Sequence, residues 1–288
     1  MASDSIFPRG RVTIVGVLNL TPDSFSDGGR FVTANEEVDV ERALGAAEAL
    51  LEAGSHVLDV GGESTRPGAA AVSQDREVAR VLPVVEGLRK RFDAPISIDT
   101  RNAECARAAL SAGAVAVNDV SGLQHDPDLA RVVAEHDATL VLGHMRGTPE
   151  TMQQYANYQD VRAEVARELG AAVERAQTAG VDRRQLVVDP GIGFSKGVQE
   201  SLELLVASDW LKKQIGLPVL VGPSRKSFLG AVTGDGIDSR DQATWAACAL
   251  AVFAGADAVR VHEPSGAVRA TALGRAAREA RGEAGGIR

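Results

Sequence analysis

The stretch TIVGVLNLTPDSFSDGGRF, residues 13–31, begins as a run of β-branched and aliphatic residues and turns polar abruptly at Asn19. The apolar run predicts a buried β-strand. The polar part that follows contains two aspartates, two serines and two glycines, and it is longer than the few residues that a connection needs. We therefore expect a functional loop here, with the amide of Asn19 at its base.

The same succession recurs along the chain, as a short β-branched segment and then an amphipathic segment rich in Ala, Glu and Arg. The predicted strands are 12–18, 56–61, 96–99, 114–120, 139–144, 186–189, 219–222 and 258–262. Most of them are continuous apolar runs, which is typical of a parallel sheet covered on both faces.

Eight strand–helix units in 288 residues predict an α/β protein with a single domain, a (β/α)8 TIM barrel. A doubly wound open sheet is the structural alternative. Its dinucleotide-binding form is not supported, because no G-x-G-x-x-G follows the first strand. We expect the barrel to span residues 12–280, with an N-terminal extension at 1–11 and a flexible tail at 281–288.

The composition is that of an ordinary globular protein, with 44% hydrophobic residues and a net charge of −8. This charge argues against nucleic acid or an anionic membrane as the main partner. No apolar run reaches the roughly 20 residues of a membrane span, and the N-terminus does not read as a secretory signal, so a cytoplasmic protein is expected. Cys105 and Cys248 are too few and too far apart for a disulfide framework or a metal cluster.

Every predicted strand ends in polar residues, and in a barrel the C-terminal ends of the strands form the active site. One aspartate there could simply cap the next helix, but this does not explain polar residues at all eight ends. The residues are Asn19, Asp59, Asp99, Asn118, His144 and Asp189, followed by the segments GPSRKS at 222–227 and RVHE at 260–263.

These polar residues divide by charge along the chain. Strands two, three, four and six supply Asp59, Asp99, Asn118 and Asp189, which we call the acidic wall. Strands seven and eight supply Arg225, Lys226, Arg260 and His262, which we call the cationic wall. The cationic wall suits a phosphate or diphosphate, and the acidic wall suits an electron-poor ring with adjacent N–H donors.

Seven segments together resemble one enzyme family. They are GVLNLTPDSFSDGG (16–29), LDVGGESTRPGA (58–69), SIDT (97–100), VNDVSG (117–122), DPGIGF (189–194), GPSRKSFLG (222–230) and VRVH (259–262). They closely resemble the dihydropteroate synthases, pterin-binding enzymes of the bacterial folate pathway, and the resemblance runs from about Val12 to Ala280.

The resemblance implies a transferase that joins 6-hydroxymethyl-7,8-dihydropterin diphosphate to 4-aminobenzoate, giving 7,8-dihydropteroate and diphosphate. It implies pterin binding by Asp99, Asn118, Val120, Met145, Asp189, Phe194, Gly222 and Lys226. It implies that Asn19, Arg260 and His262 hold the diphosphate, with Mg²⁺ bound at Asn19. The implied catalytic residues are Asp99, Asp189, Lys226, Arg260 and His262.

In such an enzyme the first two strand–helix loops, here 21–31 and 63–70, close over the site. The resemblance places Phe25, Thr65, Arg66, Pro67 and Ser224 around the aminobenzoate. Because the second loop is intact, an ordinary sulfonamide target is expected. His144 is interpreted as a packing residue of the pterin pocket.

The resemblance also implies a homodimer formed through helices late in the barrel. Two other functions remain as alternatives. One is a pterin-dependent methyltransferase that passes a methyl group to a corrinoid protein, which would have no use for a diphosphate site or the first loop. The other is a paralogue that binds pterin without catalysis.

Overall fold

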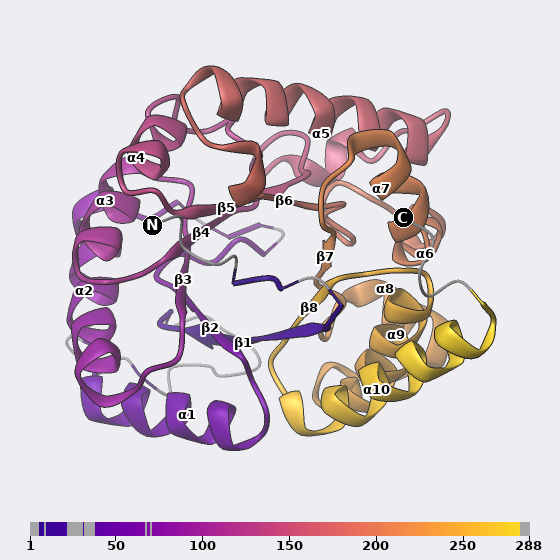
Figure 1. Ribbon diagram of the computed structural model, residues 1–288, viewed down its shortest axis with the longest axis horizontal. Helices are drawn as coiled ribbons and strands as arrows, with labels where there is room; N and C mark the ends of the chain where they lie inside the picture. The colour runs from indigo at the N-terminus through magenta and orange to yellow at the C-terminus, as the bar shows by residue number, and fades with distance from the viewer. Residues whose placement is uncertain are drawn as a thin grey trace.

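The computed structural model describes residues 6–8, 10–21, 31, 38–66, 68–69 and 71–282, and the structural statements below concern these residues. Eight parallel strands alternate with helices around a central barrel (Figure 1). The strands are β1 (Thr13–Asn19), β2 (Val57–Gly61), β3 (Ile96–Asp99), β4 (Ala116–Asp119), β5 (Thr139–Gly143), β6 (Leu186–Asp189), β7 (Leu220–Val221) and β8 (Ala258–Val261).

The helices form the outer layer of the barrel (Figure 1). They are α1 (Val40–Glu52), α2 (Gln74–Arg91), α3 (Ala103–Ser111), α4 (Leu129–Glu135), α5 (Val161–Thr178), α6 (Val198–Leu205), α7 (Ser208–Ile215), α8 (Ser227–Thr233), α9 (Asp241–Phe253) and α10 (Pro264–Ala280), with short 3₁₀ turns at Met152–Tyr155, Arg183–Gln185 and Ile237–Ser239. None of the helices in the described chain is long and apolar enough to cross a membrane.

The order of the strands confirms the barrel. Their hydrogen-bonded order is β6-β5-β4-β3-β2-β1-β8-β7, so the two ends of the sheet are β6 and β7. A parallel bridge between Val188 and Val219 joins these ends, and the Val188 N–H donates to the Pro218 carbonyl at 3.0 Å. The open-sheet alternative is therefore wrong.

All eight predicted strands are present, although several are shorter than expected. β7 is reduced to Leu220–Val221, between Pro218 and Pro223. Proline has no N–H to donate to a neighbouring strand, so pairing is limited at both ends. The domain limits at residues 12 and 280 remain predictions, although α10 does end at Ala280.

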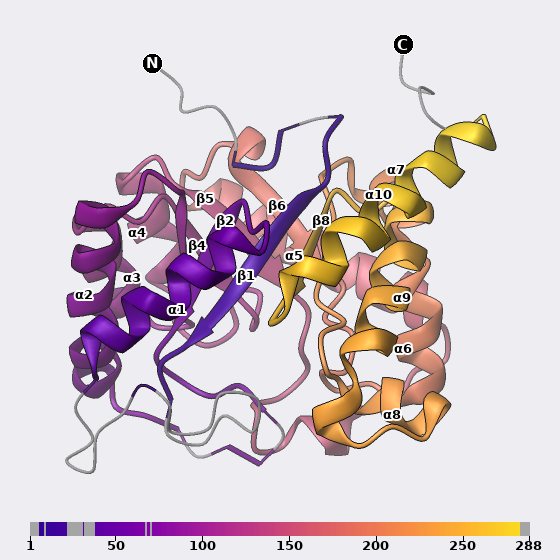
Figure 2. The same ribbon diagram turned by 90° about the horizontal axis from the view of Figure 1, so that it is seen from below.

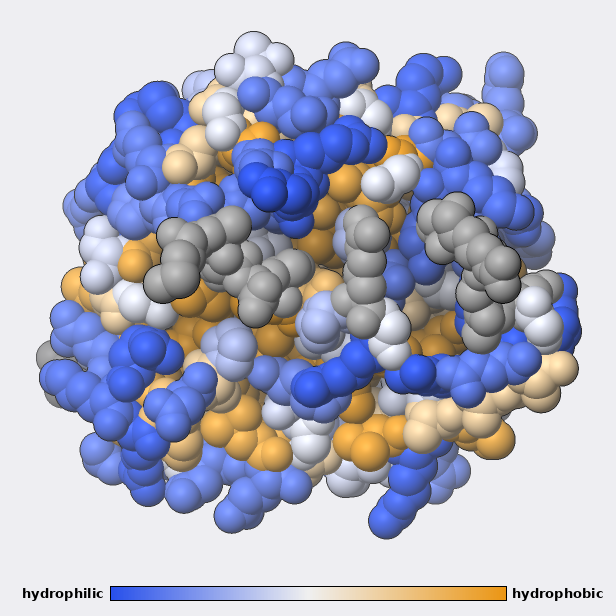
Figure 3. Space-filling model, in the orientation of Figure 1, coloured by the Kyte–Doolittle hydropathy of each residue, from blue (hydrophilic) through white to orange (hydrophobic). Residues whose placement is uncertain are grey.

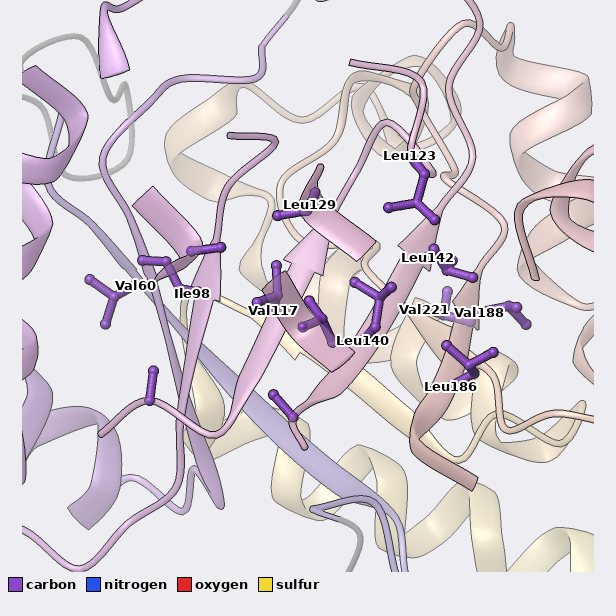
Figure 4. Close-up of a cluster of buried hydrophobic side chains, with 14 of the residues drawn as sticks. Val60, Ile98, Val117, Leu123, Leu129, Leu140, Leu142, Leu186, Val188 and Val221 are labelled. Atoms are coloured by element: carbon purple, nitrogen blue, oxygen red, sulfur yellow. The ribbon is translucent and has the colours of Figure 1, made fainter. Parts of the chain in front are cut away.

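Two apolar layers hold the strands in place. The outward-facing side chains pack against the helices, and Figure 4 shows part of this cluster, with Val60, Ile98 and Val117 from three neighbouring strands. The inside is filled at its base by a separate cluster of Phe7, Val15, Val57, Val141, Val187, Leu220 and Ala258. Since β-strand side chains alternate in direction, the inward positions two residues further on include Asp59, Asp189 and Arg260, with Gly222 beside them and Val17 and Gly143 on β1 and β5.

This alternation puts the polar residues at one end of the barrel. Figure 2 shows the arrow of β1 pointing toward the lower side of the molecule, while the yellow end of α10 lies at the upper right. In Figure 3, which has the orientation of Figure 1, polar residues surround smaller apolar areas. The apolar base and the polar mouth of the barrel therefore come from successive inward positions of the same strands.

The tight junction between β4 and β5 generates a stability prediction. A Cβ on Gly143 would lie 2.6 Å from the Val120 Cα, whereas a Cβ on Gly170 in α5 would meet open space. We expect Gly143→Ala to lower the free energy of unfolding by about 1–3 kcal/mol through overpacking. Gly170→Ala, the control, should raise it by about 0.5–1 kcal/mol because glycine weakens a helix interior. Urea unfolding of both variants measures this, and equal midpoints would contradict it.

Candidate active site

The centre of the barrel mouth is a buried ion triad of Arg260, Asp59 and Asp99. The Arg260 Nε atom lies 2.6 Å from the Asp59 Oδ2 atom, and its Nη2 atom lies 2.7 Å from the Asp99 Oδ2 atom. The side chains of Asp59 and Asp99 are 1% and 7% exposed. β1 separates β8 from β2, so the Arg260 side chain reaches across the mouth to meet carboxylates on β2 and β3.

This triad corrects the expected division into two walls. Arg260 lies between carboxylates of the acidic wall, because a buried guanidinium requires paired charge. Arg225, in the segment that follows β7, binds the carboxylate of Asp241 in α9 through its Nε and Nη2 atoms at 2.7 and 2.9 Å. Arg260 and Arg225 therefore already have acidic partners.

The charges in the triad shift one another. Burial raises the pKa of Asp99, the positive charge of Arg260 opposes this rise, and the neighbouring Asp59 adds to it. Burial alone would lower the pKa of Arg260, but Asp59 and Asp99 outweigh it and raise that pKa. In the described chain, the Oδ1 atoms of Asp59 and Asp99 are buried without a hydrogen-bond partner. Such acceptors are available to a ligand with N–H donors.

A second carboxylate–cation pair lies at the ends of β6 and β7. Asp189 accepts a hydrogen bond from the Gly191 N–H at 2.7 Å. Lys226 donates to the Ile192 carbonyl, and its Nζ atom lies 3.8 Å from the centre of the Phe194 ring. Burial lowers the pKa of Lys226 to about 8, and Asp189 opposes this fall. Burial likewise raises the pKa of Asp189, against the charge of Lys226.

The remaining predicted pterin residues lie around these charges. The Asn118 Nδ2 atom donates to the Asp59 Oδ2 atom at 3.1 Å. A Cβ on Gly222 would lie 3.8 Å from the Arg260 Cβ and 3.9 Å from the Asp189 Oδ2, so Gly222 lies between these two side chains. Val120 and Met145 belong to one apolar cluster with Met152, and Phe194 packs against it. Sequence analysis missed Met152, because it does not lie at the end of a strand and belongs to none of the family segments.

Asn19 and His262 meet on another side of the mouth. The Asn19 Nδ2 atom lies 3.5 Å from the His262 Nε2 atom. The His262 Nδ1 atom lies 2.9 Å from the Ser224 hydroxyl, which also accepts the His262 N–H at 3.1 Å. Burial and the charge of Arg260 lower the pKa of His262 well below its usual range. A neutral imidazole can then accept from Asn19 at Nε2 and donate to Ser224 at Nδ1.

Oxygen atoms suited to Mg²⁺ border a small space beside Gly61. A Cβ on Gly61 would lie 3.5 Å from the Asn19 Oδ1 and 3.7 Å from the Asp99 Oδ2. Mg²⁺ prefers hard oxygen ligands and usually keeps several waters besides one or two protein oxygens and substrate phosphates. Within the described residues, no group of three or more histidine, cysteine, aspartate or glutamate side chains could hold a metal ion. The residues present thus fit an ion that arrives with a diphosphate.

The predicted aminobenzoate residues are only partly described. Phe25 and Pro67 lie outside the described residues, as does most of the first loop. Thr65 and Arg66 are half-buried in the second loop, and Ser224 is bound to His262 as above. The Glu63 carboxylate accepts from Arg101 at 2.8 Å and from the Val72 N–H at 3.2 Å. Glu63 therefore ties both ends of the second loop to the end of β3.

Comparison with known proteins identifies the family. A model of the pterin binding enzyme family matches residues 15–262. The dihydropteroate synthase of Synechocystis is 44% identical over 262 residues, covering 90% of this chain and 88% of that protein. A crystal structure of the Yersinia pestis dihydropteroate synthase with a sulfonamide drug matches with a TM-score of 0.87 and 38% identity, covering 94% and 98% of the two chains. The structure of Xanthomonas albilineans dihydropteroate synthase with 4-aminobenzoic acid matches with a TM-score of 0.83 and 40% identity, covering 93% of this chain and 93% of that chain.

The chain belongs to the family of pterin-binding enzymes. Within that family, its relatives place it among the dihydropteroate synthases. They give no support to a corrinoid-dependent methyltransferase or to a paralogue without catalysis.

Removing a charge from the buried ion triad should lower the free energy of unfolding more than removing a charge from an exposed ion pair. Asp59→Asn should lower the free energy of unfolding by about 1–3 kcal/mol, because the Arg260 guanidinium loses one of its two charged partners. The control is Glu48→Gln, which breaks an ion pair with Arg91 at the surface. The Glu48 side chain is 47% exposed, so this substitution should change the free energy of unfolding by less than about 0.5 kcal/mol. Urea unfolding measures both, and similar losses would show that the triad does not stabilise the barrel.

Proposed function

We propose that this chain condenses 6-hydroxymethyl-7,8-dihydropterin diphosphate with 4-aminobenzoate to give 7,8-dihydropteroate and diphosphate. The observation that carries the proposal is the shared mouth of the barrel. Buried carboxylates with free acceptor atoms, at Asp59 and Asp99, lie beside the Asn19–His262 pair and the Lys226–Phe194 pair. One substrate with an N–H-bearing ring and a diphosphate can engage all of these groups at once.

The pterin ring is assigned to the deeper part of the mouth. Carboxylates accept adjacent N–H donors, and Asp99 and Asp189 supply two of them on opposite strands. The ring of Phe194 and the side chains of Met145 and Val120 provide an apolar face. Lys226, with its lowered pKa, can donate to a ring oxygen or nitrogen in place of its bond to the Ile192 carbonyl.

The reaction follows from the charge arrangement. As diphosphate leaves the methylene group attached to the pterin, positive charge develops on the ring and negative charge on the leaving group. Asp99 and Asp189 stabilise the first, and Arg260 stabilises the second. His262 can assist once its imidazole takes the other tautomer and turns its Nε2–H toward the diphosphate. An aromatic amine is unprotonated at neutral pH, so the nucleophile needs no strong general base. The dissociative transition state is part of this proposal.

Mg²⁺ belongs to the proposal as the partner of the diphosphate. Asn19 and Asp99 offer oxygen atoms next to Gly61, where a side chain would fill the space. When bound, the ion would neutralise charge on the departing diphosphate. The protein's own contribution is the position of the Asn19 amide, whose nitrogen faces His262 and leaves its oxygen toward Gly61.

The aminobenzoate is assigned to the outer part of the mouth, beside the second loop. The Xanthomonas relative was crystallised with 4-aminobenzoic acid and the Yersinia relative with a sulfonamide drug. In this chain the aminobenzoate is assigned to Thr65, Arg66 and Ser224, which lie within the described residues. The Gly68 N–H donates to the Pro149 carbonyl at 3.0 Å, which attaches the second loop to the chain after β5. We infer that the chain is likewise a sulfonamide target.

We further infer a homodimer formed through α9 and α10. Leu250 on α9 and Leu273 on α10 are 51% and 70% exposed. The two helices pack closely, since a Cβ on Gly274 would lie 2.4 Å from the Ala249 carbonyl oxygen, and the two exposed leucines are neighbours of that contact. Sedimentation of Leu273→Glu tests this, because a charge there should give a monomer, whereas an unchanged mass would refute it.

The activity is tested by incubating the protein with pterin diphosphate, 4-aminobenzoate and Mg²⁺ and following dihydropteroate. We expect product that depends on all three additions and falls when a sulfonamide is added. The absence of product with folded protein would refute the proposed function.

The pterin assignment predicts a selective loss of affinity. Asp189→Asn should weaken pterin binding by about 2 kcal/mol or more, because an amide cannot replace a charged acceptor of two N–H donors. Asp182→Asn, just before β6 at a residue that pairs with Arg184 at the surface, is the matched control and should bind pterin normally. Isothermal titration calorimetry measures both, and near-normal affinity in Asp189→Asn would refute the placement of the ring.

A further inference from the structure

A buried lysine, Lys196, lies behind the proposed pterin pocket and takes no part in the chemistry described above. Its side chain is 4% exposed. Its Nζ atom lies 2.9 Å from the Phe194 carbonyl, 3.0 Å from the Gly191 carbonyl and 3.2 Å from the His144 carbonyl. It also lies 2.9 Å from the His144 Nδ1 atom. Burial and then the charge of Lys226 lower the pKa of Lys196 well below its usual range, whereas the carboxylates of Asp189 and Glu168 raise it. The three N–H donors of an ammonium here face four acceptors, which favour the charged form.

The neighbouring imidazole links this ammonium to a carboxylate. The His144 Nε2 atom lies 2.9 Å from the Glu168 Oε2 atom, so Nε2 carries the proton and Nδ1 accepts from Lys196. Burial and the charge of Lys196 lower the pKa of His144 to about 4, so the imidazole stays neutral. His144 is thus more than the packing residue that was expected, because it connects a buried positive charge to a negative one.

Glu168, the carboxylate bound to His144, lies on α5. Its carboxylate also binds Arg146, whose Nε atom lies 3.1 Å from the Glu168 Oε2 atom. Arg146 in turn binds Glu164 at 2.7 Å, and its guanidinium lies 4.1 Å from the centre of the Tyr158 ring. The result is a chain of contacts from Lys196 through His144 to Glu168 and Arg146, which leads from the interior to the helix layer.

Two of the four acceptors of Lys196, the carbonyl groups of Gly191 and Phe194, belong to the segment 190–197 between β6 and α6, which we call the β6–α6 loop. The other two belong to His144, which follows β5. The backbone of the β6–α6 loop is unusual, because Gly191, Gly193 and Ser195 have φ angles of +64°, +79° and +44°. Neither glycine can be replaced easily, since a Cβ on Gly191 would lie 1.9 Å from the His144 carbonyl oxygen and one on Gly193 2.7 Å from the Lys226 Cδ. Left-handed backbone of this kind persists only where neighbouring groups hold it.

This loop follows Asp189 directly and carries Phe194, and both residues are assigned to the pterin. Its first N–H beyond Pro190, that of Gly191, binds Asp189, and its Ile192 carbonyl accepts from Lys226. Phe194 lies over the Lys226 ammonium, and the Phe194 carbonyl is one of the acceptors of Lys196. The backbone that places Asp189 and Phe194 therefore turns its carbonyl groups toward two lysines, Lys226 on one side and Lys196 on the other.

We propose that Lys196 is a positioning residue that holds the β6–α6 loop in the shape that binds the pterin ring, with Glu168 as its counter-ion through His144. The inference rests on the proposed function. Burying an ammonium is costly, and an apolar side chain of the same length would stabilise a core better. The hydrogen bonds of Lys196 to the Gly191 and Phe194 carbonyl groups of the loop, and to the His144 carbonyl group beside the loop, account for a charged residue here.

Two sets of variants test the inference by calorimetry with 6-hydroxymethylpterin and, separately, with inorganic diphosphate and Mg²⁺. Lys196→Met keeps the stem and removes the ammonium. It should lower pterin affinity by at least about tenfold, which corresponds to the loss of a few hydrogen bonds. Diphosphate affinity should stay within about twofold, because Asn19 and His262 lie on other strands. A residue that only stabilised the fold would change both affinities together or neither.

Glu168→Gln and Glu164→Gln form a matched pair, should Lys196→Met fail to fold. Both remove a carboxylate of α5 that binds Arg146, but only Glu168 contacts His144. Glu168→Gln should lower pterin affinity by about threefold or more, and Glu164→Gln should leave it within about twofold. Equal affinities in this pair, or normal pterin binding by folded Lys196→Met, would overturn the inference. If the unchanged protein bound no pterin, the proposed function itself would fall, and this inference with it.

Discussion

The mouth of the barrel depends on one buried cation, the Arg260 guanidinium, held between Asp59 and Asp99. Neither carboxylate could remain in an interior this dry without a positive partner, and the arginine equally needs both. Because the three residues come from β8, β2 and β3, their contact joins strands on both sides of β1. The same contact occupies one oxygen of Asp99 and leaves the other free, so the interaction that fixes the site also prepares an acceptor for substrate.

The rest of the site follows from the alternation of side chains along the strands. Inward positions are apolar at the base and polar two residues later, as in Val57 and Asp59 or Val187 and Asp189. The apolar base keeps water from the underside of these charges. Burial raises the pKa values of Asp99 and Asp189 and lowers the pKa of Lys226 to about 8. A neighbouring opposite charge counters each of these three shifts, so ligand binding at one end of the mouth should influence the other.

Most of the fold could be predicted from the sequence, because eight apolar runs with polar ends have few other arrangements. Asn19, Asp99, Asn118 and Asp189 could be assigned to one site, since strand ends of a barrel converge. The pairing of Arg260 with Asp59 could not be predicted, because it joins residues 201 positions apart across the barrel. The pairing of Arg225 with Asp241 could not be predicted either, because it depends on the packing of α9. Lys196 gave no pattern signal, because its acceptors are backbone carbonyl groups that a sequence does not distinguish.

The central claim is that one substrate spans this mouth, with its ring among the buried carboxylates and its diphosphate beside Asn19 and His262. The most direct measurement is a crystal structure of the protein with 6-hydroxymethylpterin diphosphate, Mg²⁺ and a sulfonamide. We expect the ring within hydrogen-bond distance of Asp99 and Asp189, against Phe194, and the diphosphate within reach of Arg260 and His262. A ligand bound instead in the groove between α1 and the start of α10, bordered by Arg42 and Pro264, would contradict the account.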